Sequence, residues 1–340
     1  MAERPIEERS VNNLLRLLEL SAVLVASSAE RPDISLYDEA RLTAAVAACL
    51  SLCAEESGAA LAELRQRPSF LLVSGDLAGG IQQFIYTIPS KGALKSLRGR
   101  SFYLDVLLEN LADEILGACG LSRSCRLYTG GGHFYLLLPA TEKIKSLLSS
   151  FEEETNQWFL EHFGSRLYLA LAWAEGTGAD ISGAAPGGVG GMFRAAYEIL
   201  ATKKLRRYSP EQLGMMFSPD SGVNKTRDGS RECGVCHTSA ADLAPYAPEY
   251  EKETLACEVC RNLFSMGEKM LKGDGFLLSS EKRGNALPLP GYGRTLYLST
   301  IPEGETPARE GRVRVYWKNR RGLPEEGANY LWLGDYATRD

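Results

Sequence analysis

The sequence predicts an α+β chain of four parts, and three observations carry this prediction. Residues 1–64 place apolar side chains at helical spacing, residues 65–208 alternate strand and helix patterns, and residues 209–285 contain two close cysteine pairs. Residues 286–340 complete the chain with short strand patterns separated by Pro, Gly and Glu turns. A chain of 340 residues has room for two or three domains of about 150 residues each.

The first part, residues 1–64, is expected to be a helical segment without strands. One amphipathic stretch begins at Leu14 and a second at Leu42, each with apolar residues three or four positions apart. Arg16 and Glu19 interrupt the first stretch, so it is too short and too polar to span a bilayer.

The second part, residues 65–208, follows the order β-α-β-β-α-β-α, which is ferredoxin-like. An apolar run before a glycine predicts a buried strand, and two runs around three glycines predict a hairpin. The expected elements are strand 70–74, a helix with its apolar stripe over 104–115, strands 125–128 and 133–138, helix 143–162, strand 166–173, a loop over 176–191 and helix 192–205.

The third part, residues 209–285, is expected to be a small zinc-ribbon domain. Cys233 and Cys236 form one C-x₂-C pair, Cys257 and Cys260 form a second, and 20 residues lie between the two pairs. Four thiolates complete a tetrahedron around zinc, which leaves no position for a substrate and predicts a structural Zn²⁺. A redox role is disfavoured because redox motifs do not occur as a matched double, and His237 is interpreted as a bystander.

Composition limits the function classes further. The net charge of -5 gives no overall footprint for nucleic acid, so any such contact must come from local basic patches. The first ten residues lack the positive start of a signal peptide. The four cysteines outside the two C-x₂-C pairs lie in apolar segments and are expected to be inert core residues. A reducing cytoplasm fits this pattern best.

Two glycine-rich segments about fifty residues apart carry the functional prediction. The segment 73–88 predicts a strand that ends in a glycine-rich turn, and the segment 127–139 predicts a hairpin with a three-glycine tip. Bare backbone N–H groups of such turns can hold anions. The candidate nucleotide-binding residues are Ser74, Gly75, Asp76, Gly79, Gly80, Gln82, Thr129, Gly130, Gly131, Gly132 and His133.

These segments have the layout of a nucleotide-cyclase palm. In cyclases that make dinucleotide signals the hairpin reads Gly-Gly-Asp-Glu-Phe, whereas Gly132 and His133 stand here in place of the two acids. Two-metal nucleotidyl transfer needs such carboxylates. The sequence therefore predicts a degenerate, GGDEF-like palm without catalytic residues of its own.

Several candidates allow two interpretations. Asp76 either binds a metal or caps the following turn, with capping favoured, and His133 either stacks on a base or fills the hairpin. A basic cluster enters the long helix, and it either contacts phosphate or RNA or forms a solvated helix start. Its members are Lys91, Lys95, Arg98 and Arg100.

The same segments resemble a known family. The runs 74–88, 91–104 and 128–139 closely resemble the first palm of the large subunit of type III (Csm-type, III-A) CRISPR effector complexes. The run 34–50 is similar to the segment that precedes that palm, and the cysteine pairs occur where the family carries a zinc-binding insertion. The resemblance covers residues from about 30 to 340.

This resemblance implies a function and partners. Family members make cyclic oligoadenylate from ATP when the complex binds target RNA, with two ATP molecules between two palms and Mg²⁺ on a Gly-Gly-Asp-Asp hairpin of the second palm. The implied partners are a guide-handle-binding subunit, small helical subunits, the guide and target RNAs and the second palm half.

The sequence departs from the family pattern in three ways. It contains no Gly-Gly-Asp-Asp hairpin and no His-Asp doublet, so it predicts neither the second palm nor an HD nuclease. Glu39 follows Asp38 where the family commonly has His, which makes residues 1–64 a remnant of an HD-type region. Gly79 and Gly80 lengthen the glycine turn by one residue. The sequence ends soon after an apparent strand, and this ending is expected to reflect a split gene or a truncation.

Two alternatives come from other classes. The chain could be a stand-alone cyclase-like nucleotide sensor, or a structural zinc-stapled scaffold of a ribonucleoprotein in which the glycine hairpin is only a tight turn. Nucleotide binding by the isolated chain separates the scaffold from the other two, and copurifying RNA separates the CRISPR subunit from the sensor.

Overall fold

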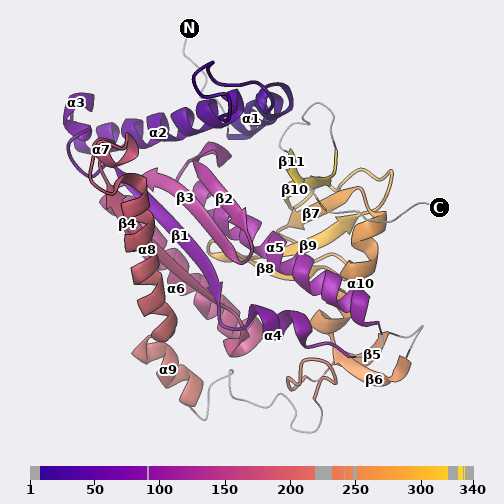
Figure 1. Cartoon of the computed structure of the whole chain (residues 1–340). Helices are drawn as coiled ribbons and strands as arrows, with labels where there is room; N and C mark the ends of the chain where they lie inside the picture. The colour runs from indigo at the N-terminus through magenta and orange to yellow at the C-terminus, as the bar shows by residue number, and fades with distance from the viewer. Residues whose placement is uncertain are drawn as a thin grey trace.

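The computed structural model describes residues 8–89, 92–218, 232–240, 242–247, 251–320, 328–331 and 333. Its helices are α1 Glu8–Ala22, α2 Leu36–Ser57, α3 Leu61–Leu64, α4 Ile81–Tyr86, α5 Ala93–Ala118, α6 Glu142–Phe163, α7 Gly178–Ile181, α8 Gly188–Leu205, α9 Pro210–Phe217 and α10 Glu258–Lys272. Its strands are β1 Phe70–Ala78, β2 Arg126–Gly130, β3 His133–Pro139, β4 Tyr168–Gly176, β5 Leu243–Ala247, β6 Glu251–Cys257, β7 Gly275–Ser279, β8 Leu287–Gly291, β9 Arg294–Ile301, β10 Arg312–Lys318 and β11 Ala328–Leu331. The chain is thus a mixed α+β fold (Figure 1).

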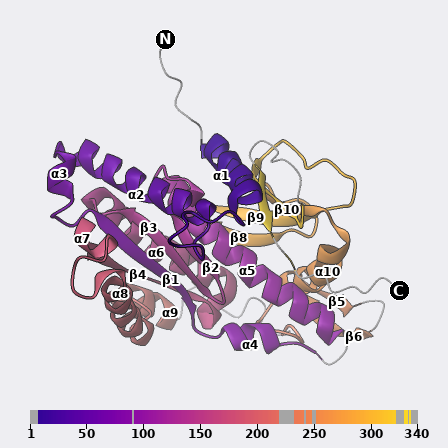
Figure 2. The same cartoon turned by 45° about the horizontal axis from the view of Figure 1, so that its top comes forward.

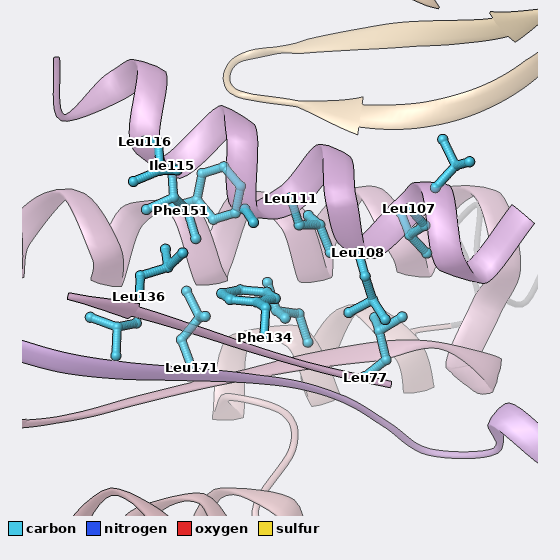
Figure 3. Close-up of a cluster of buried hydrophobic side chains, with 14 of the residues drawn as sticks. Leu77, Leu107, Leu108, Leu111, Ile115, Leu116, Phe134, Leu136, Phe151 and Leu171 are labelled. Carbon is cyan, nitrogen blue, oxygen red and sulfur yellow. The ribbon is translucent and has the colours of Figure 1, made fainter. Parts of the chain in front are cut away.

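The four-stranded sheet has the order β2-β3-β1-β4, and each neighbouring pair is antiparallel. Helices α4 and α5 connect β1 to β2 and helix α6 connects β3 to β4, which agrees with the predicted β-α-β-β-α-β succession apart from the short additional α4. Helices α5 and α6 cover one face of this sheet, where Phe134, Leu136 and Leu171 pack against Leu108, Leu111 and Phe151 (Figure 3).

Helix α8 covers part of the opposite face of the same sheet. Leu200 of α8 packs on Ala78, Tyr168, Ala170 and Ala172, which lie on β1 and β4. This helix begins at Gly188 and α7 precedes it, so the predicted loop over 176–191 is wrong for these residues. Glycine and alanine richness suggested a loop, but Thr177 and Asp180 form a capping box that begins a helical turn.

The second sheet has five strands in the order β11-β10-β7-β9-β8. Helix α5 lies between the two sheets (Figure 2). Its Tyr103 and Asn110 side chains donate hydrogen bonds to the carbonyl oxygens of Pro288 and Pro290 on β8 at 2.6 Å each. The strand patterns of residues 286–340, which lie at 295–299, 313–317 and 330–333, match β9, β10 and part of β11, whereas β7 and β8 were not predicted. Both sheets share one hydrophobic core.

Residues 8–64 contain α1, α2 and α3, which agrees with the helical segment predicted for residues 1–64, of which 1–7 lie outside the described residues. Helix α2 packs on β3, where the Cys49 thiol lies 3.6 Å from the carbonyl oxygen of Leu137. Ser35 caps this helix at its start, and Gly58 ends it in the left-handed conformation. Within the described parts of the chain, none of the helices has the length and apolar content of a membrane span.

Candidate functional site

The glycine turn and the glycine hairpin meet at one end of the four-stranded sheet. Strand β1 ends at Ala78, and Gly79 and Gly80 turn the chain into α4 with φ angles of +105° and +127°. The hairpin closes over two residues, Gly131 and Gly132, with φ angles of +59° and +91°. Positive φ at both central residues is the geometry that favours glycine in a tight hairpin.

A backbone bond joins the two glycine segments. The N–H of Leu77 donates to the carbonyl oxygen of Gly132 at 2.9 Å. A side chain at Gly132 would also meet the Cδ1 atom of Ile81, the first residue of α4, at 2.7 Å. The hairpin tip, the end of β1 and the start of α4 therefore form one compact end.

Gly75 belongs to the strand and not to the anion-holding turn that the sequence predicted. It pairs with Phe134 on β3 and Leu171 on β4, so its backbone is inside the sheet. A Cβ atom on Gly75 would lie 2.1 Å from the Phe134 ring, which occupies the space above it. The glycine is thus explained by close packing, which the sequence pattern did not reveal because the strand continues to Ala78.

Asp76 is a buried strand residue and does not cap the turn, so the favoured interpretation was wrong. Its side chain is only 6% exposed and forms an ion pair with Lys204 of α8, and its Oδ2 atom lies 3.2 Å from Nδ1 of His133. The strand places Asp76 directly opposite His133, which is why the two side chains share one face of the sheet. His133 itself remains 44% exposed.

The remaining nucleotide-site candidates are divided between locations. Ser74 is buried on β1, on the same face as Asp76, and Gln82 is exposed on α4. Thr129 pairs with Phe134, so it points to the face of the sheet that α5 covers. It lines a cavity of about 450 Å³ between α1, α2, α5 and β11, away from Asp76 and His133.

The predicted basic cluster contacts the cysteine region instead of solvent. Lys95 pairs with Glu268 at 3.2 Å, and Arg98 donates to the carbonyl oxygen of Gly267 at 3.2 Å. Arg100 is only 2% exposed, so the prediction that it contacts phosphate or RNA is wrong. Lys91 lies outside the described residues.

The four cysteines of the two C-x₂-C pairs come together as predicted. The sulfurs of Cys233, Cys236, Cys257 and Cys260 all lie within 4.8 Å of one another, and those of Cys236 and Cys257 are 3.8 Å apart. Four sulfurs at about 2.3 Å from a tetrahedral zinc ion lie about 3.8 Å apart, so the arrangement fits a four-thiolate metal site.

Backbone and side-chain donors surround this cluster. The N–H groups of Val235, Cys236 and Cys257 point to the Cys233 sulfur at 3.3–3.4 Å. Arg100 donates to the Cys260 sulfur at 3.3 Å and to the carbonyl oxygen of Phe84 at 2.9 Å. Such donors stabilise thiolates and fix the orientation of metal ligands. Arg100 therefore links the cysteine cluster to α4.

Two residues that sequence reasoning missed lie at the glycine turn. Lys204 reaches Asp76, and the Arg207 guanidinium lies over Gly79, where a Cβ atom would be 2.7 Å from Nη1. Both belong to the basic run 203–207 at the end of α8. The run was a visible signal, but only the fold shows that it returns to the turn.

Comparison with known proteins places this arrangement in a family. Residues 69–219 match the family model described as Csm1 subunit domain B. A Cas10/Csm1 protein of subtype III-A from Mycobacterium tuberculosis is 36% identical over 351 residues, which cover 96% of this chain and 42% of the relative. The chain belongs to the Csm1 family. A Streptococcus thermophilus relative of the same description is 33% identical over 99% of this chain and 43% of its own length.

Solved structures agree with this assignment. A Csm1–Csm4 cassette in complex with AMPPNP matches with a TM-score of 0.67 and 25% identity over 94% of this chain and 37% of that chain. The cassette in complex with cA4 matches with a TM-score of 0.64 and 25% identity over the same shares. The chain thus spans about two fifths of the length of its Csm1 relatives.

Proposed function

We propose that the chain is the first-palm portion of the large subunit of a type III-A CRISPR effector complex and forms one wall of an ATP pocket. The supporting observation is the compact glycine end, where Gly79, Gly80, Gly131 and Gly132 adopt positive φ angles beside the buried Asp76. Backbone without side chains permits close approach of a base or a phosphate. Relatives of this fold occur in complexes with AMPPNP and with cA4.

In this proposal the pocket is completed by a second palm that is not part of these residues. No Gly-Gly-Asp-Asp hairpin is present in the sequence, and Asp76 is already paired with Lys204. The Mg²⁺ ions and the catalytic carboxylates would therefore come from the second palm, and the product would be cyclic oligoadenylate. This chain would position ATP and exclude water from one side.

In this proposal each part of the chain has the role predicted from the sequence. Residues 1–64 would be the helical remnant, 65–208 the GGDEF-like palm, 209–285 the zinc module and 286–340 the segment leading to the second palm. The Cys₄ cluster would hold structural Zn²⁺. The partners of this chain in a cytoplasmic complex would be a Csm4-type subunit, the small helical subunits, and the guide and target RNAs. Relatives are known in complex with Csm4.

A reconstitution experiment tests this proposal. The chain is incubated with ATP and Mg²⁺ alone, and then together with a Csm4-type subunit, guide and target RNA and a separately expressed second palm that carries Gly-Gly-Asp-Asp. We expect no turnover by the chain alone and cyclic oligoadenylate from the complete mixture. Product from the chain alone, or a second palm that neither binds this chain nor makes product with it, would contradict the proposal.

A further inference from the structure

The C-terminal end of α8 brings two cations to the glycine turn. Lys204 pairs with Asp76, whose carboxylate also contacts His133. Arg207, two residues beyond the end of α8, places its Nη1 atom where a side chain at Gly79 would be and donates its Nε–H to the carbonyl oxygen of Lys204 at 3.3 Å. The two cations are thus held next to the turn and not free in solvent.

The charges around the turn do not cancel. Asp76 supplies one negative charge against the positive charges of Lys204 and Arg207. In the part of the chain that the structure describes, no carboxylate forms an ion pair with Arg207, whereas the neighbouring Lys203 is directed to Glu152. An excess positive charge therefore remains at Gly79 and Gly80.

We propose that Lys204 and Arg207 bind the phosphate groups of the nucleotide at the glycine turn. This inference rests on the proposed function and assigns its phosphate contacts to the end of α8 and the residues after it, because Lys95, Arg98 and Arg100 contact the cysteine region. A triphosphate suits the site, since Lys and Arg both bind phosphate and the glycines leave their backbone accessible. Asp76 acts as a positioning residue that holds the Lys204 ammonium at the turn.

The test measures binding of ATP, inorganic triphosphate and adenosine to the full chain by isothermal titration calorimetry. The variants are Lys204→Met and Arg207→Met, with Lys203→Met and Arg206→Met as controls that remove the same charge from the same run. Arg207→Met leaves the buried Asp76 paired, so it remains informative even if Lys204→Met impairs folding. Circular dichroism of every variant verifies that it is folded.

We expect each test variant to weaken binding of ATP and of triphosphate about tenfold, the cost of one lost charge-assisted contact. The control variants should retain wild-type affinity, and adenosine binding should be unchanged throughout. Raising the salt concentration should weaken triphosphate binding to the wild type more than to the test variants.

The outcomes separate this inference from the proposed function. If all variants bind ATP equally, the assignment of the phosphate contacts to Lys204 and Arg207 is wrong, but the proposal that this chain forms one wall of the ATP pocket stands. If triphosphate binds through Lys204 and Arg207 but ATP does not bind, the assignment holds and the ATP pocket fails. If the wild type binds neither ligand, both are overturned.

Discussion

The glycine end of the four-stranded sheet and the crossing of α5 with α10 both depend on glycine, but for different physical reasons. At the sheet end, Gly131 has a φ angle of +59° and open space around it. At the helix crossing, a Cβ atom on Gly99 would lie 1.9 Å from the carbonyl oxygen of Leu263, and one on Gly267 would lie 1.9 Å from that of Lys95. Gly131 therefore needs backbone freedom, and the helix crossing needs the absence of a side chain.

This difference distinguishes the candidate binding site at the sheet end from the helix packing that supports it. Gly131 can be replaced by a residue that tolerates the left-handed conformation, whereas a Cβ atom at Gly79 or Gly132 would meet Arg207 or Ile81. The helix crossing brings two backbones into direct contact and leaves no room at all. It fixes the cysteine region against α5, where Ser96 and Tyr246 also share a hydrogen bond.

Loss of the metal should give the largest effect. Cys257→Ser removes one ligand of the cluster, and we expect the zinc content to fall from about one ion per chain to nearly none, with the melting temperature lowered on the order of 10 °C. Metal analysis and thermal unfolding measure this. Cys119→Ser, a partly buried cysteine outside the cluster, is the control and should keep the metal. Full metal retention by Cys257→Ser would contradict the four-cysteine site.

A methyl group at the helix crossing should have the next largest effect. Gly267→Ala must push the two helices apart, and we expect a loss of about 3 kcal/mol or more in the free energy of unfolding. Gly117→Ala, on the open side of α5, meets no atom within 4 Å and should stabilise the protein by about 0.5–1 kcal/mol. Urea denaturation of both variants checks this, and equal midpoints would show that the helices do not touch.

The sequence could predict what local chemistry determines. The hairpin follows from the glycine run at 130–132, the metal site from the spacing of its cysteines and α6 from its amphipathic pattern, because each signal lies within a short stretch of chain. The contacts of Arg98 and Arg100 could not be predicted in this way. Whether a basic residue faces solvent or a helix 160 residues away depends on tertiary packing.

The same limit explains the two corrections at the sheet end. Gly75 looks like a turn residue in the sequence, but the Phe134 ring from another strand determines its role. Asp76 looks like a cap or metal ligand, but Lys204, more than a hundred residues later, neutralises it. A pattern of residues reports on the backbone nearby and not on the partners that the fold supplies.

The C-terminal half of α5 is held by ion pairs, so its contribution to stability can be tested by varying the pH. Burial raises the pKa of Asp113, but Arg123 and Arg314 outweigh that effect and lower the pKa to about 2 from its ordinary value of 3.8. The stabilisation is therefore present above about pH 4 and is lost as the pH falls towards 2.

The contribution of Asp113 amounts to about 2 kcal/mol of unfolding free energy. Asp113→Asn should flatten the fall in stability between pH 4 and pH 2, although it lowers stability at neutral pH. Urea denaturation across this range measures the slope. Asp242→Asn, at the exposed partner of Arg261, is the control and should keep the wild-type slope. An unchanged slope in Asp113→Asn would show that this carboxyl does not carry the pH dependence.

The smallest effect is expected at the hairpin tip. Gly131→Asn should change the free energy of unfolding by less than about 0.5 kcal/mol, because asparagine tolerates the left-handed conformation and nothing lies within 4 Å. Gly131→Val should cost about 1–2 kcal/mol, since a branched side chain does not tolerate it. Thermal unfolding distinguishes the two. Equal costs would indicate that space, and not backbone conformation, limits this position.

Hydrogen–deuterium exchange of the full chain with and without ATP tests the central claim most directly. The account predicts that ATP protects backbone amides at Gly79 and Gly80, at Gly131 and Gly132 and at the end of α8, while the α5–α10 crossing exchanges at an unchanged rate. Protection confined to another surface, such as the cavity lined by Thr129, would contradict the claim that the glycine end forms the wall of the ATP pocket.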